Sequence, residues 1–224
     1  MFRVKICGIT SVEDAGVVAE AGADAVGLNF YARSKRYVPV AQAQAIAGSL
    51  PAGVVKVGLF VNAPASEVCE TFDRVGLDLI QLHGDEPPSF LARMGGRPVV
   101  KAFRLREPDG LDAIGRYLAE CRGMECMPQM TLVDAHVEGA YGGTGQVADW
   151  QALTSYQRGE PGESLPPLVL AGGLTPDNVA EAIRTVRPAA VDTASGVESA
   201  PGRKDRALVE RFVQAAQRAF EDLG

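Results

Sequence analysis

The chain has few of the residues that build metal sites or disulfide frameworks. Among 224 residues there are four cysteines and two histidines. The cysteines at positions 7, 69, 121 and 126 include no Cys-x-x-Cys pair, so they lack the spacing of a zinc site. Unpaired cysteines at this low density are typical of a reducing compartment. We therefore expect a cytoplasmic protein without a cysteine-based metal site or disulfides.

Long apolar runs and clusters of positive charge are also missing. No apolar stretch approaches the roughly 20 residues that span a membrane, and no basic segment followed by a long apolar one opens the chain. The formal net charge is −6, without a run of Lys or Arg. These absences argue against a membrane or nucleic acid as partner.

What is present is an eightfold alternation of short apolar runs with helical patterns. The predicted strands are Arg3–Cys7, Ala25–Phe30, Val54–Val61, Leu79–His83, Val99–Phe103, Met130–Asp134, Leu168–Ala171 and Ala189–Thr193. The predicted helices are Ser11–Ala21, Val40–Leu50, Ala65–Val75, Pro87–Met94, Asp109–Arg122, Ala148–Tyr156, Pro176–Val186 and Lys204–Leu223. Ser11 and Thr175 have side chains suited to capping the first and seventh of these helices.

Strict alternation of this kind requires parallel strands joined by right-handed crossovers. Eight such units close naturally into a (β/α)8 TIM barrel, and we predict this α/β fold as a single domain over residues 1–224. An open doubly wound sheet has the same alternation and is the alternative. We interpret residues 158–167, rich in Gly, Pro and Glu, as a loop before the seventh strand.

Polar residues gather at the predicted carboxyl ends of the strands. Cys7, His83 and Asp134 each end a strand, and Asn29 lies near the end of another. In a barrel of this class, these ends and the loops after them form the active face. The sequence therefore predicts one site that contains all four side chains.

The first strand has unlike faces. Period-2 alternation places Lys5 and Cys7 on one face, with Val4 and Ile6 on the other. We expect the apolar face to contact helices and the thiol to face inward beside a cation. A free thiol has a pKa of about 8.5, and a nearby ammonium is expected to lower it.

Small residues follow the last two strands. Gly172 and Gly173 follow the seventh strand, and Ser195 and Gly196 follow the eighth. Barrels of this class commonly hold phosphate there through backbone N–H groups, which small residues leave accessible. We therefore predict a phosphorylated small molecule as substrate.

Seven segments carry a resemblance that covers nearly the whole chain. They are Lys5–Thr10, Gly27–Phe30, Ser34–Val38, Gln81–Glu86, Val133–Asp134 with Gly142–Gly145, Leu170–Val179 and Val191–Glu198. In this order they resemble the phosphoribosylanthranilate isomerase family. The resemblance implies a (β/α)8 barrel enzyme of tryptophan biosynthesis, working without cofactor or metal, and we expect a monomer or a homodimer.

The resemblance also implies a reaction and its residues. N-(5-phosphoribosyl)anthranilate would be converted to 1-(2-carboxyphenylamino)-1-deoxyribulose 5-phosphate by an Amadori rearrangement. Asp134 would be the general acid that opens the ribose ring, and must therefore carry a proton, a state that burial near apolar groups favours. Cys7 would be the general base that removes the C2 proton. Arg36 would bind the anthranilate carboxylate, for which its planar fork is suited.

His83 and Gly143 are implied to contact the substrate, and the glycine-rich loop 135–147 to close over it. His83 with Asp85 and Glu86 also imitates a metal cluster, although neighbouring carboxylates on a turn are poorly placed to chelate. We expect no metal there.

Three departures from the family pattern involve four residues. Lys35 replaces a usual proline and is expected to loosen the presentation of Arg36, Gln146 replaces a lysine, and Thr193–Ala194 replaces a Val-Ser pair. Two other functions stay open: the related aldose–ketose isomerisation of histidine biosynthesis, which is associated with two carboxylates, and a sugar-phosphate binding protein without turnover.

Overall fold

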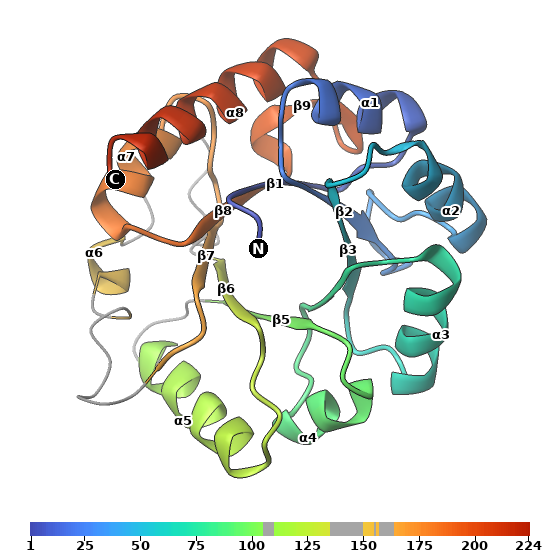
Figure 1. The fold of residues 1–224 in the computed structure, drawn as a ribbon, viewed down its shortest axis with the longest axis vertical. Helices are drawn as coiled ribbons and strands as arrows, with labels where there is room; N and C mark the ends of the chain where they lie inside the picture. The colour runs from blue at the N-terminus through green and yellow to red at the C-terminus, as the bar shows by residue number, and fades with distance from the viewer. Residues whose placement is uncertain (105–109, 135–149, 155, 157–163) are drawn as a thin grey trace.

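The computed structural model of this chain describes residues 1–104, 110–134, 150–154, 156 and 164–224. Eight parallel strands form a closed barrel in the order β1 to β8, with β1 hydrogen-bonded to β8. Figure 1 looks into this barrel and shows the helices as an outer ring. The predicted (β/α)8 fold is confirmed. The open doubly wound sheet is wrong, because each strand here has two neighbours.

Most elements lie within a few residues of their predicted bounds. The barrel strands are β1 (Val4–Cys7), β2 (Ala25–Asn29), β3 (Val55–Phe60), β4 (Leu79–Leu82), β5 (Val99–Arg104), β6 (Met130–Asp134), β7 (Leu168–Ala171) and β8 (Ala190–Thr193). The helices are α1 (Val12–Glu20), α2 (Val40–Ser49), α3 (Ala65–Val75), α4 (Pro88–Leu91), α5 (Gly110–Gly123), α6 (Trp150–Leu153), α7 (Val179–Val186) and α8 (Arg206–Glu221).

A short hairpin that was not predicted lies between β8 and α8. Its strands are β9 (Glu198–Ala200) and β10 (Arg203–Lys204), paired antiparallel. Helix α8 was expected to begin at Lys204 but begins at Arg206. Asp205 caps it, since its Oδ1 accepts the Leu208 N–H at 3.0 Å.

The two predicted helix caps have different outcomes. The Ser11 Oγ accepts the Asp14 N–H at 3.0 Å, so the cap of α1 is confirmed. The cap at Thr175 is wrong, because α7 begins at Val179. The Thr175 N–H donates to Asn178 Oδ1 at 2.8 Å, and this contact closes a turn before the helix.

The alternating faces of the strands separate two cores. Outward side chains such as Val4 and Ile6 pack against the helices, as predicted. Inward side chains such as Val57, Leu132 and Val169 fill the barrel. Buried polar side chains such as Lys5 and Gln81 also face this interior.

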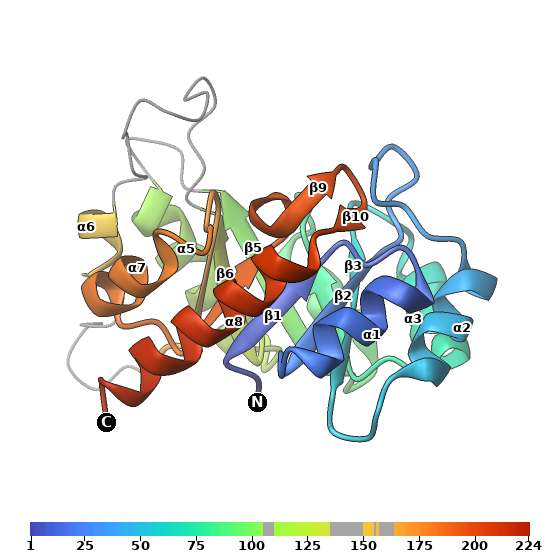
Figure 2. The ribbon, with the colours of Figure 1, turned by 90° about the horizontal axis from the view of Figure 1, so that it is seen from above.

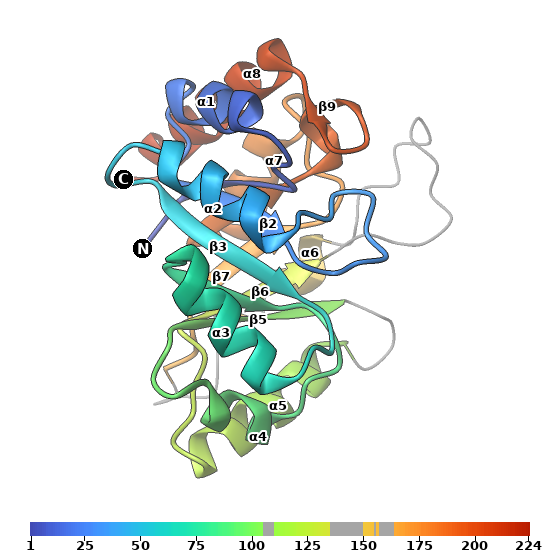
Figure 3. The same cartoon turned by 90° about the vertical axis from the view of Figure 1, so that its right-hand side faces the viewer.

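The two ends of the barrel also differ in what they carry. Both chain termini lie at the end where the strands begin, and the β9–β10 hairpin lies toward the other end (Figures 2 and 3). In the described part of the chain, no helix combines the length and apolar character required to cross a membrane.

Candidate active site

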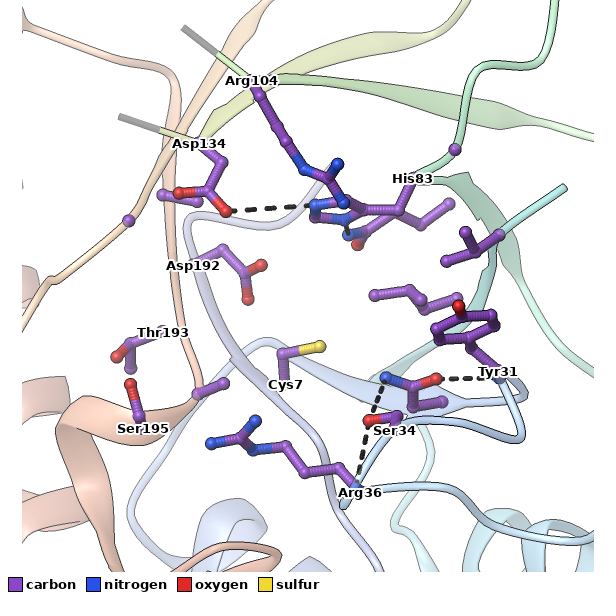
Figure 4. A pocket seen from close by; sticks show the side chains of 18 of the residues that line it. Cys7, Tyr31, Ser34, Arg36, His83, Arg104, Asp134, Asp192, Thr193 and Ser195 are labelled. Atoms are coloured by element: carbon purple, nitrogen blue, oxygen red, sulfur yellow. Dashed lines mark hydrogen bonds and ion pairs between the residues drawn. The ribbon is translucent and has the colours of Figure 1, made fainter. Parts of the chain in front are cut away.

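A cavity of about 740 Å³ opens at the carboxyl ends of the strands. Figure 4 shows the side chains that point into it. The predicted site residues that line it are Cys7, Arg36, His83, Asp134, Gly172, Gly173 and Ser195. Gly196 directly follows Ser195, and Gly143 lies outside the described residues, as does the loop expected to close over the site. The sequence thus correctly placed residues from distant segments around one space.

Cys7 ends β1 with its thiol directed into this cavity and only 6% of the residue exposed. Burial raises the pKa of the Cys7 thiol, and Asp192 adds to the increase, although Lys5 and Lys204 oppose it. The Lys5 ammonium lowers the pKa of the thiol, as expected, but desolvation is the larger influence and the net shift is upward.

The ammonium beside Cys7 has a partner that the sequence analysis missed. The Lys5 Nζ lies 2.9 Å from Asp192 Oδ1, and both side chains are buried. Burial alone disfavours the ammonium, but Asp192 and Cys7 outweigh it and raise the pKa of Lys5. Lys5 therefore keeps its charge. Asp192 could have been found from the closed barrel, because Lys5 and Asp192 are register partners on β1 and β8.

Asp134 and His83 form a pair on the far side of the cavity. His83 Nε2 lies 4.0 Å from Asp134 Oδ2, and His83 Nδ1 is 2.9 Å from Gln81 Nε2. Burial lowers the pKa of His83 to about 4, despite the opposing charge of Asp134. The imidazole is thus neutral at pH 7. The Asp134 side chain is 29% exposed, so it is less buried than we expected for an acid that must retain a proton.

The loop after β2 is fixed by Asn29. Its Oδ1 accepts the Tyr31 N–H at 2.9 Å, and its Nδ2 donates to Ser34 Oγ at 3.1 Å. Ser34 Oγ in turn accepts the Arg36 N–H at 3.1 Å. The loop therefore holds the main chain of Arg36 in place, contrary to the loosening expected from Lys35.

The Arg36 guanidinium is bound by Glu198, a residue to which sequence reasoning gave no role. Nε and Nη2 donate to the two carboxylate oxygens at 2.7 and 2.6 Å. This double hydrogen bond raises the pKa of Arg36. The side chain is 25% exposed and lines the cavity.

The loops after β7 and β8 are packed together. Thr193 Oγ1 donates to Leu174 O at 2.7 Å. A Cβ on Gly196 would lie 1.9 Å from the same carbonyl oxygen, so only glycine permits this approach. As a result, Gly172, Gly173 and Ser195 border the cavity together, as predicted for a phosphate site.

Glu86, one of the residues near His83 that imitate a metal cluster, is bound by other protein groups. Its carboxylate is buried, pairs with Lys101 Nζ at 2.9 Å and accepts the Asn62 N–H at 2.8 Å. Nowhere in the described ranges do three His, Cys, Asp or Glu side chains converge as metal ligands would. Glu86 instead secures the turn after β4. Arg104 also lines the cavity and was missed, because we predicted β5 to end one residue earlier.

This fold and this cavity define a class, the (β/α)8 barrel enzymes whose polar site lies at the carboxyl ends of the strands. The family model described as N-(5'phosphoribosyl)anthranilate (PRA) isomerase matches residues 4–215. A relative from Geobacter sulfurreducens, named N-(5'-phosphoribosyl)anthranilate isomerase, is 49% identical over 217 residues, covering 97% of this chain and 99% of its own. The chain belongs to the PRA isomerase family.

Solved structures agree with this assignment. The phosphoribosyl anthranilate isomerase of Thermotoga maritima superposes with a TM-score of 0.85 at 38% identity. The match covers 97% of this chain and 100% of the Thermotoga chain. A second solved isomerase contains reduced 1-(o-carboxyphenylamino)-1-deoxyribulose 5-phosphate, with a TM-score of 0.82 at 37% identity over 97% of this chain and 100% of its own. The comparisons therefore agree on both the fold and the family.

Proposed function

We propose that this chain catalyses the isomerisation of N-(5-phosphoribosyl)anthranilate to 1-(2-carboxyphenylamino)-1-deoxyribulose 5-phosphate, the isomerase step of tryptophan biosynthesis. Membership of the PRA isomerase family supports the reaction. The observation that carries the assignment of residues is that Cys7 and Asp134, from β1 and β6, face one cavity (Figure 4). The carboxylate pair associated with the histidine-pathway reaction is not matched, because a thiol occupies the first position.

In the first step Asp134 acts as general acid. It gives a proton to the ribose ring oxygen, the bond between this oxygen and C1 breaks, and the nitrogen lone pair forms an iminium at C1. His83 Nε2 lies 4.0 Å from Asp134 Oδ2, and this imidazole is neutral at pH 7.

In the second step Cys7 acts as general base. Its thiolate removes the C2 proton, which the iminium has made acidic, and the bonding electrons form an enaminol that tautomerises to the ketone. A raised pKa makes the thiolate a stronger base but a rarer species at neutral pH. The Lys5 ammonium offsets the negative charge of the thiolate.

The ends of the substrate are charged, and the cavity offers a group for each. Arg36 binds the anthranilate carboxylate through its planar fork, and backbone N–H groups near Gly172, Gly173, Ser195 and Gly196 bind the phosphate. His83 lines the sugar site, and Gly143 completes the predicted contacts. Residues 1–224 would work as one barrel domain, a cytoplasmic monomer or homodimer, without metal or cofactor.

The test follows the loss of anthranilate-type fluorescence when the protein is mixed with phosphoribosylanthranilate. We expect turnover by the wild type, and losses of at least about 100-fold in Cys7→Ala and in Asp134→Asn, since each removes a proton-transfer group. Cys69→Ala and Asp177→Asn, which make the same changes outside the cavity, should retain activity. A wild type without turnover, or two active-site variants with wild-type rates, would refute the assignment.

A further inference from the structure

Two buried side chains of the β9–β10 hairpin connect parts of the site without lining the cavity. Glu198 and Lys204 are register partners in the hairpin, and their side chains are 4% and 0% exposed. The hairpin lies between β8 and α8 and forms a two-stranded sheet separate from the barrel. A buried ion pair at this position therefore calls for an explanation beyond barrel closure.

Lys204 connects the ends of β1 and β8. Its Nζ donates to Cys7 O at 2.7 Å, to Ala194 O at 3.0 Å and to Glu198 Oε1 at 3.0 Å. An ammonium has three donors and no acceptor, so each donor has a partner. One charge thus fixes the main chain of the proposed base and the residue that precedes Ser195.

Glu198 connects Lys204 to Arg36. A guanidinium has five N–H groups in one plane, and Glu198 takes the Nε and one Nη2 hydrogen. The other edge, formed by Nη1 and the second Nη2 hydrogen, can bind a second carboxylate in the same bidentate way. Gly8 makes room for this arrangement, because a Cβ there would lie 2.3 Å from Arg36 Cδ. In Figure 4 the guanidinium lies between Cys7 and Ser195.

We propose that Glu198 and Lys204 are positioning residues that hold the free edge of Arg36 and the Cys7 main chain in place for a carboxylated substrate. The inference rests on the proposed function. A long arginine side chain loses rotamer freedom when it is fixed, and the hairpin moves this loss from substrate binding to folding. Neither residue touches the substrate, so both act through others.

Glu198→Gln tests the first half of the proposal. The amide nitrogen cannot accept a hydrogen bond, so one bond to Arg36 is lost with little change of volume. We expect KM for phosphoribosylanthranilate to rise about tenfold, with kcat within about twofold. In an Arg36→Met background the same substitution should change KM by less than about twofold, since residues that act as a unit are not additive. Glu210→Gln, on the exposed face of α8, is the matched control.

Lys204→Met tests the second half. The Lys204 charge lowers the pKa of Cys7, so its loss should lower kcat and move the alkaline rise of the rate to higher pH. The proposal would be overturned if Glu198→Gln raised KM by the same factor with Arg36 present and in the Arg36→Met background. It would also be overturned if the pH–rate profile of Lys204→Met had the same midpoint as that of the wild type. Because wild-type turnover is measured in the same assay, its absence would refute the proposed function separately. If Lys204→Met does not fold, the Glu198→Gln cycle decides alone.

Discussion

Cys7 has two opposing influences at one atom. The two nearby ammonium groups stabilise its thiolate, whereas burial and the Asp192 carboxylate disfavour it, and the second pair of influences is larger. A sequence can show that a lysine and a cysteine share a strand face. It does not show how much water the fold removes from them, and this amount decided the direction of the shift.

The first prediction concerns alkylation of Cys7. Because burial raises the pKa of this thiol above its ordinary value, its reaction with iodoacetamide should be slow at pH 7 and should still be increasing at pH 9. The measurement is mass-spectrometric quantification of the peptide that contains Cys7 across this pH range. Cys69 in the same sample serves as a partly exposed internal reference. A Cys7 rate that levels off below pH 8 would contradict the shift.

The second prediction concerns His83. Its imidazole should remain neutral down to a pH of about 4, which NMR of the ring carbons can follow. The unfolded chain takes up this proton near pH 6.5, the folded chain only near 4. Between these values the unfolded state binds more protons, so the contribution of His83 to stability falls as the pH falls. His83→Gln identifies which NMR signal belongs to His83 and which to His136, the second histidine. The same substitution should reduce the pH dependence of stability between pH 4 and 6.5. A His83 titration near pH 6.5 would contradict the prediction.

At the scale of elements, hydrophobic periodicity predicted the barrel strands and the long helices. It did not predict features that depend on a single turn, such as the β9–β10 hairpin and the start of α7. Strands β9 and β10 are three and two residues long, too short to show any alternation. The start of α7 depends on a contact between Thr175 and Asn178, which competes locally with a helix cap. Barrel strands were predictable because each repeats the same two-faced pattern.

The third prediction concerns the end of α5. Here the Cys126 N–H donates to Cys121 O at 2.9 Å, the Glu125 N–H to Arg122 O at 3.2 Å, and Glu125 has a φ of 55°. This is a Schellman motif with a non-glycine residue in the left-handed position. Glu125→Gly should therefore stabilise the protein by about 0.5–1 kcal/mol, measured by urea unfolding.

A matched substitution separates backbone strain from a general effect of glycine. Glu120→Gly lies inside the same helix, where glycine should destabilise by about 1 kcal/mol. If both variants lose stability, the left-handed conformation of Glu125 does not destabilise the protein. A gain for Glu125→Gly with a loss for Glu120→Gly would support backbone strain at Glu125.

At the scale of the whole molecule, the eightfold alternation and inward parity predicted the barrel and the segments that meet at its mouth. What they did not predict were the partners of those residues. Asp192, Glu198 and Lys204 lie between about 160 and 200 positions from Lys5, Arg36 and Cys7, with which they pair. Only closure of the barrel between β1 and β8 brings these segments together, so no local pattern contains this information.

The last prediction tests that closure. Lys5 on β1 and Asp192 on β8 are register partners across the junction between the two ends of the barrel, and their ion pair is buried. Lys5→Met would remove the cation that is hydrogen-bonded to the buried Asp192 carboxylate, and should destabilise the protein by about 3–5 kcal/mol in urea unfolding. Lys5→Met with Asp192→Leu should recover most of this loss, because two apolar side chains can replace a buried pair.

The comparison is with a pair of the same chemistry at the surface. Lys56 on β3 lies 3.3 Å from Asp78, just before β4, with side chains 26% and 46% exposed. Lys56→Met should cost less than about 1 kcal/mol, because water screens this interaction. If Lys5→Met costs no more than Lys56→Met, the buried pair does not stabilise the junction. Since β1 and β8 would then be held by their backbone hydrogen bonds and apolar faces alone, the role of Lys5 would be limited to the charge it places beside Cys7.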